Sequence, residues 1–210
     1  MITEKQRQER INYLGSSDIA AILCVSPYAN AYDIWLEKTG RVMLSNKTDS
    51  SLEAGTFLEA GILDWCESKV GKLKRYNNEG IKDNIEIIVP GFPIVDHPDA
   101  IVIDSGRPVE AKTAGLFGPL TENYGEGIYE LPDRVVIQCH VHILATNTDK
   151  CYVPCFIGGR GFVMYEVEKN QIILDAVMDS SITFWDDYVQ QDNPPPNIIP
   201  SGDFVRRIKR

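Results

Sequence analysis

Two acidic residues and a lysine, placed around a short apolar run, could carry chemistry in this chain. Asp99 stands just before the β-branched run 101–103. Glu110 and Lys112 follow a segment that contains Gly and Pro. This order of residues is typical of a strand, a turn and a second strand, and it predicts a β-hairpin. Because residues i and i+2 of a strand share a face, Glu110 and Lys112 point the same way, and the hairpin can bring Asp99 beside them.

Two carboxylates and an ammonium group on one face suit a divalent metal ion. Mg²⁺ takes oxygen ligands, often one or two carboxylates completed by waters and substrate phosphate oxygens. The ammonium group can hold the attacking water or balance the charge of the pentavalent phosphate. This set is the layout of metal-assisted phosphodiester hydrolysis. The spacing alone leaves a second reading open, a solvated strand face with an ordinary ion pair between Glu110 and Lys112.

A helix predicted over residues 55–67 adds a third carboxylate. Leu58, Ile62 and Trp65 form its apolar stripe. Glu59 lies next to this stripe, where burying a carboxylate costs free energy unless it has a partner. A metal ion or a basic residue across a cleft would be such a partner, and an ordinary boundary glutamate is the alternative.

A second helix, predicted from residue 132 to residue 146, is apolar nearly all round and should be buried. Gln138 and His142 lie one turn apart and form its polar stripe. Buried polar groups must be satisfied, and a scissile phosphate or an active-site water would satisfy this stripe. Cys139, His140 and His142 are too close together, and too badly phased on a helix, to form a zinc site.

The amino-terminal segment has the features of an anion site. Ser16, Ser17 or Asp18 can cap a helix, and Arg10 precedes them. The free N–H groups and the dipole at a helix start favour negative charge. A plain capped core helix is the alternative.

Together these residues resemble the phage lambda exonuclease and YqaJ-like recombinase nucleases of the PD-(D/E)xK superfamily. The resemblance runs from about residue 10 to about residue 189 and rests on motifs in a fixed order. These motifs are Arg10, Gly15-Ser16-Ser17-Asp18-Ile19-Ala20-Ala21-Ile22-Leu23, Ser26-Pro27-Tyr28, Trp35-Leu36, Thr39-Gly40, Gly55, Glu59, His97-Pro98-Asp99, Glu110-Ala111-Lys112-Thr113 and Gln138. The fold it implies is an α/β restriction-endonuclease-like core, with a central mixed β-sheet flanked by helices.

The activity that this resemblance implies is a Mg²⁺-dependent 5′-to-3′ exonuclease, with Mn²⁺ as a substitute ion. Such an enzyme degrades one strand of double-stranded DNA from its ends in phage-type recombination by single-strand annealing. The implied partners are DNA ends, a single-strand annealing protein and further copies of the chain in a homotrimeric ring. A structure- or sequence-specific endonuclease of the same superfamily and a non-catalytic DNA-end binding protein are the alternatives.

The resemblance also implies roles for catalytic positions. Asp99 and Glu110 would be metal ligands, helped by the backbone carbonyl of Ala111. Lys112 would position or activate the water, and Gln138 would orient the phosphate or the water.

Further roles concern a second metal position and the DNA end. Glu59 would support a metal-bound water or a second metal. The candidates for binding the 5′-phosphate and DNA are Arg10, Ser17, Ser16 and Arg134. The family prototype has an Arg six residues beyond the catalytic Lys, where this chain has Gly118. Either Arg134 or Lys74 replaces that Arg, or the preference for a 5′-phosphate is weaker.

The expected organisation is a single nuclease domain over residues 1–193, followed by a tail at 194–210. A helical part (1–70) precedes the catalytic core (71–193), and the alternation of strands and helices indicates an α/β domain. Residues 115–130 are expected to form a loop at the mouth of the cleft. The elements expected in the core are strands at 73–76, 85–89, 101–103, 108–112, 151–157 and 162–168, and a last helix from Asn170 that ends at the prolines 194–196.

Composition is compatible with this function. The chain has 210 residues and a formal net charge of −9, which argues mildly against a DNA partner because phosphate contacts dominate DNA affinity. Basic residues are nevertheless clustered at 72–75 and 206–210.

There is no signal peptide and no apolar run near ~18 residues, so no membrane contact is expected. The 5 cysteines are odd in number and lie mostly in apolar runs. They are typical of reduced thiols in a cytoplasmic protein. The family resemblance implies that this cytoplasm is that of a bacterial host and that a phage or prophage encodes the protein. Only Cys151 and Cys155 are locally paired, which argues against an iron–sulfur cluster.

Overall fold

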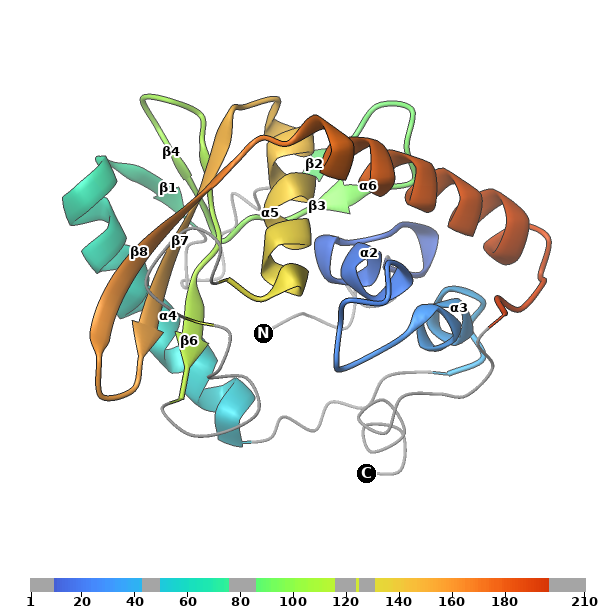
Figure 1. The fold of residues 1–210 in the computed structure, drawn as a ribbon, viewed down its shortest axis with the longest axis horizontal. Coiled ribbons are helices and arrows are strands. Elements are labelled where there is room, and N and C mark those ends of the chain that lie inside the picture. The colour runs from blue at the N-terminus through green and yellow to red at the C-terminus, as the bar shows by residue number, and fades with distance from the viewer. Residues whose placement is uncertain (1–9, 43–49, 76–85, 116–123, 125–130, 197–210) are drawn as a thin grey trace.

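A six-stranded mixed β-sheet forms one half of the molecule, and a cluster of helices forms the other half (Figure 1). The computed structural model describes residues 10–42, 50–75, 86–115, 124 and 131–196. The order of paired strands is β1-β4-β5-β7-β6, and β8 pairs with the other edge of β7. The strands are β1 (Leu73–Arg75), β4 (Ala100–Val102), β5 (Pro108–Val109), β6 (Lys112–Ala114), β7 (Lys150–Ile157) and β8 (Gly161–Glu168).

Strands β5 and β6 are two parts of one extended segment along the same edge of β7. Both pair with β7 in parallel and in the same register, as in the Lys112–Cys155 pair. Between them, the Glu110 N–H donates to the β7 backbone at 2.9 Å, whereas the Ala111 N–H donates to the Asp99 side chain at 2.7 Å. The single strand expected over 108–112 is divided at residues 110 and 111, because the residue of β7 that should donate to the Glu110 carbonyl is Pro154, which has no N–H.

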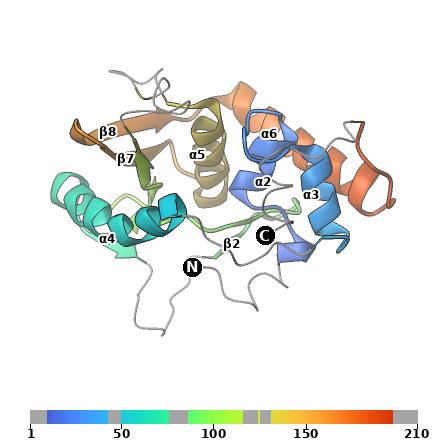
Figure 2. The same cartoon turned by 90° about the horizontal axis from the view of Figure 1, so that it is seen from below.

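One helix covers each face of the sheet (Figure 2). Successive side chains of a strand point to opposite faces, so β7 contributes to two separate cores. On one face, β7 and β8 pack against α5 (Asp133–Thr146), through Cys151, Val153, Cys155, Tyr165 and Val167 of the strands and Val135, Cys139 and Ile143 of the helix. On the other face, α4 (Ser50–Val70) packs through Leu63 and Cys66 against Leu73, Ala100, Val102 and Val109.

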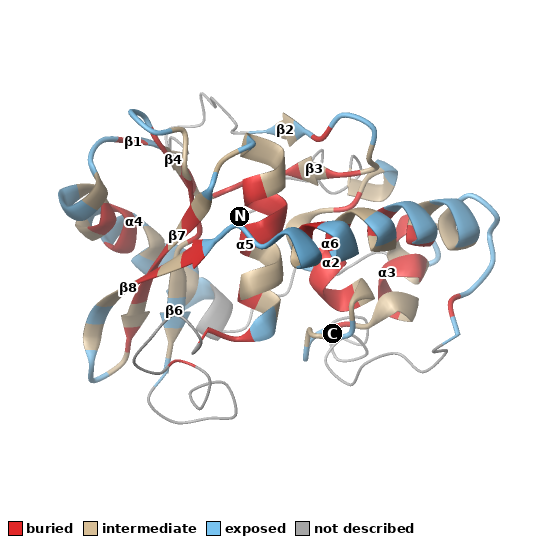
Figure 3. Ribbon diagram, turned by 45° about the horizontal axis from the view of Figure 1, so that its top comes forward, coloured by how far each residue is buried: buried red, intermediate tan, exposed pale blue. Residues whose placement is uncertain are grey.

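Helix α5 also faces the helical half, and this double contact explains why it is apolar nearly all round. It packs against α2 (Ser16–Ile22) and α6 (Gln171–Thr183). Helix α3 (Ala31–Lys38) packs against α2, and a π-helical segment, η4 (Phe184–Val189), continues α6. Figure 3 shows buried residues along α2 and α5 and in the middle of the sheet. The core of the helical half contains Leu14, Ile19, Ala21, Ile34, Trp35, Val141, Val177 and Phe184.

Asparagine residues mark three of the helix ends. Asn30 caps α3, where its side chain accepts the Asp33 N–H at 3.0 Å. Asn170 caps α6 and accepts the Ile172 N–H at 3.0 Å, so the last helix begins where the sequence predicted. Asn147 ends α5 in the left-handed conformation, which Asn tolerates better than most residues. These caps agree with local sequence preferences.

Most of the expected strands and helices are present, with four corrections. The expected strand at 85–89 has its described part in β2 (Ile87–Ile88), which pairs with the unpredicted β3 (Val95–Asp96) in a small separate sheet. The last helix stops at Val189, before the prolines. Strand 108–112 is divided, as described above. Leu58, expected in the apolar stripe of α4, is 42% exposed, because the buried face of α4 runs through Ile62, Leu63 and Cys66.

Some expectations fall on residues that the structure does not describe. The loop at the cleft mouth lies mostly outside the described residues, as does most of the tail. None of the helices in the described ranges is both long enough and apolar enough to cross a membrane.

Candidate active site

The predicted hairpin is present and brings the three candidate catalytic residues together. Strand β4 pairs antiparallel with β5, with Ala100 opposite Val109. Asp99 stands one residue before β4, so it lies opposite Glu110, and its Oδ2 accepts the Ala111 N–H at 2.7 Å. The site therefore lies where the segment before β4 leaves the sheet and the β5–β6 segment is interrupted.

Glu110 is buried, and both of its carboxylate oxygens have partners. Oε1 contacts the ammonium group of Lys112, and Oε2 lies 3.1 Å from Nε2 of His142. Burial opposes ionisation of Glu110, but the positive charges of Lys112 and His142 outweigh this and hold its pKa below the ordinary value. Burial likewise opposes the charge on Lys112, yet Glu110 and Asp99 raise the pKa of the Lys112 ammonium group. This ion pair is therefore charged at neutral pH.

The surroundings of Asp99 shift its pKa in the opposite direction to that of Glu110. Burial, and next the negative charge of Glu110, raise the pKa of Asp99 well above its ordinary value, although Lys112 and the Ala111 N–H oppose this. Within the part of the chain that the structure describes, Oδ1 of Asp99 accepts no hydrogen bond. Asp99 is thus a carboxylate whose charge the protein leaves partly uncompensated.

Glu59 reaches the same cluster from the other side, on α4. It is half-buried, and burial together with the negative charge of Glu110 raises its pKa, whereas Lys112 lowers it. Helix α4 packs on β6, the strand that begins at Lys112. The structure therefore places Glu59 within electrostatic reach of the three hairpin residues, and among the described residues it forms no hydrogen bond or ion pair.

His142 corrects the interpretation of the polar stripe on α5. A phosphate or water was expected to satisfy this stripe, but His142 is fully buried between two carboxylates. Its Nδ1 lies 2.9 and 2.8 Å from the two oxygens of Asp96, and its Nε2 faces Glu110. Burial lowers the pKa of His142, but the two carboxylates outweigh it and raise the pKa well above the ordinary value. The ring is satisfied by the protein itself.

Asp96 is the residue of this cluster that sequence reasoning missed. It lies at the end of β3 and is completely buried. A carboxylate directly after the apolar pair Ile94-Val95, and three residues before Asp99, was the signal that could have found it. The partner could not be found in this way, because His142 lies 46 residues further along the chain.

The remaining residues of α5 have separate environments. Gln138 is half-buried one turn before His142, and no hydrogen bond to it is found in the described ranges. His140 is a satisfied core histidine. Its Nδ1 lies 2.7 Å from the Val136 carbonyl oxygen, and its Nε2 accepts the Asn170 N–H at 3.1 Å.

Arg134 and Lys74, the two alternatives for the missing Arg, lie in different places. Arg134 is in the first turn of α5, and its guanidinium group stacks over the Tyr28 ring at 5.5 Å. Lys74 is exposed on β1, at the edge of the sheet, separated from the β5–β6 segment by β4. Gly118 lies outside the described residues.

The amino-terminal group is built on a buried ion network. Asp18 accepts from Arg10 Nη2 at 3.1 Å and contacts Lys38 Nζ at 2.7 Å. Lys38 also donates to the Arg10 carbonyl oxygen at 2.8 Å. Burial of Asp18 opposes ionisation, but Lys38 and then Arg10 overcome it and lower the pKa of Asp18 to about 2.

The expected helix cap is corrected by this network. Helix α2 begins at Ser16 with Gly15 as its cap, so none of Ser16, Ser17 and Asp18 takes that position. Asp18 instead stands at the third helical position and accepts the Gly15 N–H at 2.9 Å. Ser17 is exposed and Ser16 is half-buried.

The donor set fits a hydrated Mg²⁺ ion. In the described ranges, no three His, Cys, Asp or Glu side chains are grouped so that they could hold a metal ion by themselves. Mg²⁺ does not need such a cage, since one or two carboxylates and retained waters suffice. Asp99, with a free oxygen and a raised pKa, is the group that a cation would stabilise, and Glu110 is held ionised beside it.

Comparison with known proteins places this chain in a family. The model of the YqaJ-like viral recombinase domain matches residues 4–149. The uncharacterized protein YqaJ of Bacillus subtilis is 26% identical over 190 residues, which cover 89% of this chain. The match covers 56% of YqaJ, so this chain spans little more than half the length of that relative.

Solved structures share the fold at low sequence identity. An alkaline exonuclease (LHK-Exo) from Laribacter hongkongensis superimposes with a TM-score of 0.67 at 13% identity, over 90% of this chain and 94% of that one. A phage-related exonuclease from Haemophilus somnus 129PT has a TM-score of 0.54 at 9% identity, over 89% of this chain and 100% of that one. The expected fold class, a central mixed sheet flanked by helices, is confirmed, and the alkaline exonuclease shares this fold.

Proposed function

This chain belongs to the YqaJ-like viral recombinase domain family, and we propose that it is a Mg²⁺-dependent deoxyribonuclease that digests double-stranded DNA from its ends. The observation that carries the proposal is the convergence of Asp99, Glu110 and Lys112 at the interrupted strand. An ionised carboxylate, a second carboxylate with a free oxygen and a permanently charged amine meet there. A solvated ion pair would not explain why Glu110 is buried and Asp99 is left uncompensated.

The proposed metal site consists of Asp99, Glu110 and the Ala111 carbonyl. Mg²⁺, or Mn²⁺ in its place, would supply Lewis-acid polarisation of the scissile phosphate there. Glu110 is ionised at any pH at which the enzyme would work, because the charges of Lys112 and His142 lower its pKa. Asp99 is prevented from rotating freely by the hydrogen bond from Ala111.

The amine of Lys112 would act as a donor and not as a base. Its raised pKa keeps it protonated, so it can hold the attacking water by its oxygen and balance the charge that develops on the phosphate. Glu59, with its raised pKa, is suited to accept a proton from that water or to hold a second water. Gln138 would orient the phosphate or the water from α5.

The DNA end would be recognised by the amino-terminal group. Arg10 is oriented by one hydrogen bond to Asp18 and keeps further N–H donors for a phosphate. Ser17 is exposed nearby on α2, and Ser16 and Arg134 are further candidates. We propose that these residues bind the terminal 5′-phosphate, which would set the 5′-to-3′ direction of digestion.

The biological setting proposed is phage-type recombination in a bacterial cytoplasm. The enzyme would expose a single strand for an annealing protein. We propose one nuclease domain over residues 1–193, assembled as a homotrimeric ring with the tail 194–210 available for contacts. A ring would retain DNA without tight binding, which reconciles a net charge of −9 with a DNA substrate.

Digestion of end-labelled linear duplexes in Mg²⁺, with and without a 5′-phosphate, tests this function. The expected result is loss of one strand from its 5′ end, faster on phosphorylated ends, with covalently closed circular DNA left intact. Cleavage of the circular DNA would instead identify a structure- or sequence-specific endonuclease. Binding of ends without cleavage in Mg²⁺ or Mn²⁺ would identify a DNA-end binding protein.

A further inference from the structure

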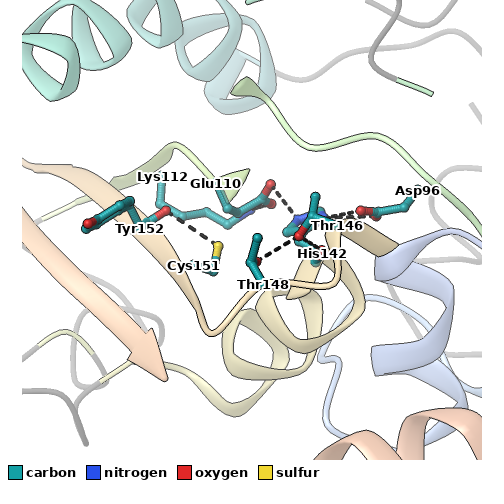
Figure 4. Close-up of polar contacts among 8 residues, drawn as sticks. All are labelled: Asp96, Glu110, Lys112, His142, Thr146, Thr148, Cys151 and Tyr152. Carbon is teal, nitrogen blue, oxygen red and sulfur yellow. Dashed lines mark hydrogen bonds and ion pairs between the residues drawn. The ribbon is translucent and has the colours of Figure 1, made fainter. Parts of the chain in front are cut away.

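A line of buried polar side chains extends from the proposed metal site into the helical half of the molecule. Figure 4 shows His142 between Asp96 and Glu110, with Lys112 on the far side of Glu110. The Nδ1 atom of His142 is within 2.9 Å of both Asp96 oxygens, and its Nε2 atom is 3.1 Å from Oε2 of Glu110. Asp96, Glu110 and His142 are all buried.

The chemistry of these groups decides which of them donate. Ionised carboxylates only accept hydrogen bonds, whereas a doubly protonated imidazole donates from both nitrogens. Glu110 is ionised, because it also contacts Lys112. Of the side chains that the structure describes, only His142 hydrogen-bonds to Asp96. His142 therefore connects Asp96 to Glu110, with one ring nitrogen facing each carboxylate.

We propose that His142 is a positioning residue for the metal ligand Glu110, and that Asp96 orients the His142 ring. This inference rests on the proposed nuclease function. His142 holds Oε2 of Glu110 on the side of α5, while Lys112 contacts the other oxygen, Oε1. These two contacts fix the orientation of the Glu110 carboxylate close enough to Asp99 for its charge to raise the Asp99 pKa. Groups that hydrogen-bond to metal ligands in this way typically change metal affinity by about 10- to 100-fold when they are removed.

A neighbouring histidine shows that this arrangement is specific. His140 lies on the same helix and is similarly buried, but its Nε2 accepts a backbone N–H and it contacts neither Asp96 nor Glu110. His140 is therefore a matched control for the loss of a buried imidazole from α5.

Two amide substitutions separate the two donors of His142. The amide nitrogen of Gln reaches about as far as Nε2, so His142→Gln keeps a donor toward Glu110. The shorter His142→Asn keeps a donor toward Asp96 instead. The affinity of each variant for Mn²⁺ alone would be measured by isothermal titration calorimetry, with the melting temperature measured in parallel.

Our expectation is that His142→Asn weakens Mn²⁺ binding by roughly 10- to 100-fold, while His142→Gln stays within a few-fold of the wild type. His140→Gln should leave Mn²⁺ affinity unchanged even if it lowers the melting temperature. Equal affinities of His142→Asn and the wild type would overturn the inference, as would an equal loss in His140→Gln. A wild type that neither binds Mn²⁺ nor digests DNA would reject the proposed function itself.

Discussion

The Ala111 N–H donates a 2.7 Å hydrogen bond to the Asp99 carboxylate. This bond joins the start of the hairpin to the residues between β5 and β6, where Pro154 of β7 has no N–H to donate and the pairing with β7 is interrupted. The proposed metal site lies at this interruption, beside the two carboxylates.

Asp99→Asn should abolish digestion without destabilising the protein. The folded-state pKa of Asp99 is raised, so its ionised form costs stability at neutral pH, and this cost disappears as the pH falls below the unfolded-state value of ~4. The amide oxygen of Asn can still accept the Ala111 N–H. We expect activity to fall by more than about 100-fold. Loss of a residue that only hydrogen-bonds to a metal ligand typically costs about 10- to 100-fold, so a direct ligand should cost more. Melting temperatures at pH 7 should rise with Mg²⁺ for the wild type only.

Asp104→Asn is the matched control for this change, because Asp104 is an exposed aspartate at the turn of the same hairpin. It should retain both activity and the rise in melting temperature with Mg²⁺. If Asp99→Asn kept more than a few per cent of the activity, Asp99 would not be a metal ligand.

Arg10→Ala should slow digestion of 5′-phosphorylated ends far more than of 5′-hydroxyl ends. A lost charge-assisted hydrogen bond is worth ~1.5–3 kcal/mol, which corresponds to roughly a tenfold to hundredfold change in rate. Initial rates on two duplexes that differ only in the 5′ group measure the difference. Arg41→Ala is the control, because Arg41 forms an exposed ion pair with Asp192 in the same half of the molecule. Equal slowing on both duplexes would show that Arg10 acts only through Asp18.

Asp18→Asn should destabilise the protein in a pH-dependent way. It removes the nearer carboxylate from the buried ammonium group of Lys38 and leaves, among the described residues, only Glu37, at 3.7 Å. Breaking a buried pair costs about 3–5 kcal/mol. The folded-state pKa of Asp18 is lowered to about 2, so the ionised carboxylate stabilises the folded protein above the unfolded-state pKa. This stabilisation is lost as the pH falls from the unfolded-state pKa to the folded-state value. The free energy of unfolding in urea should therefore differ between wild type and variant at pH 7, and the difference should shrink at pH 3.

The control for this prediction is Asp192→Asn, which removes the exposed partner of Arg41 and should be nearly neutral at every pH. A difference between wild type and Asp18→Asn that stays constant from pH 7 to pH 3 would contradict the assigned role of the ionised carboxylate.

Light scattering should give a mass three times the 23.6 kDa of one chain. A closed cyclic trimer needs two different surface patches that meet head to tail. Processivity would be measured on the same sample, from the length distribution of products under trap DNA. A monomer that digests processively would exclude the ring as the cause of processivity.

The pattern of residues along the chain was sufficient to predict the hairpin and most of the helices. Period-2 and period-3.6 patterns act through near neighbours, so they were correct for β7, β8, α5 and the start of α6 at Asn170. They failed where a neighbour in space competes with the local pattern. The strand over 108–112 is divided because Pro154 of the neighbouring β7 has no N–H to donate there, and Leu58 is exposed because α4 turns a different face to the sheet.

The candidate site shows the same division. The sequence by itself determined that Asp99, Glu110 and Lys112 share one place, because a hairpin and strand alternation bring them together. Only the tertiary structure decided the partners of His142 and Asp18. Asp96 is 46 residues from His142 along the chain, and Lys38 is on a different helix from Asp18. A buried polar group must find a partner, but which partner it finds depends on how the layers pack, and no local pattern specifies that.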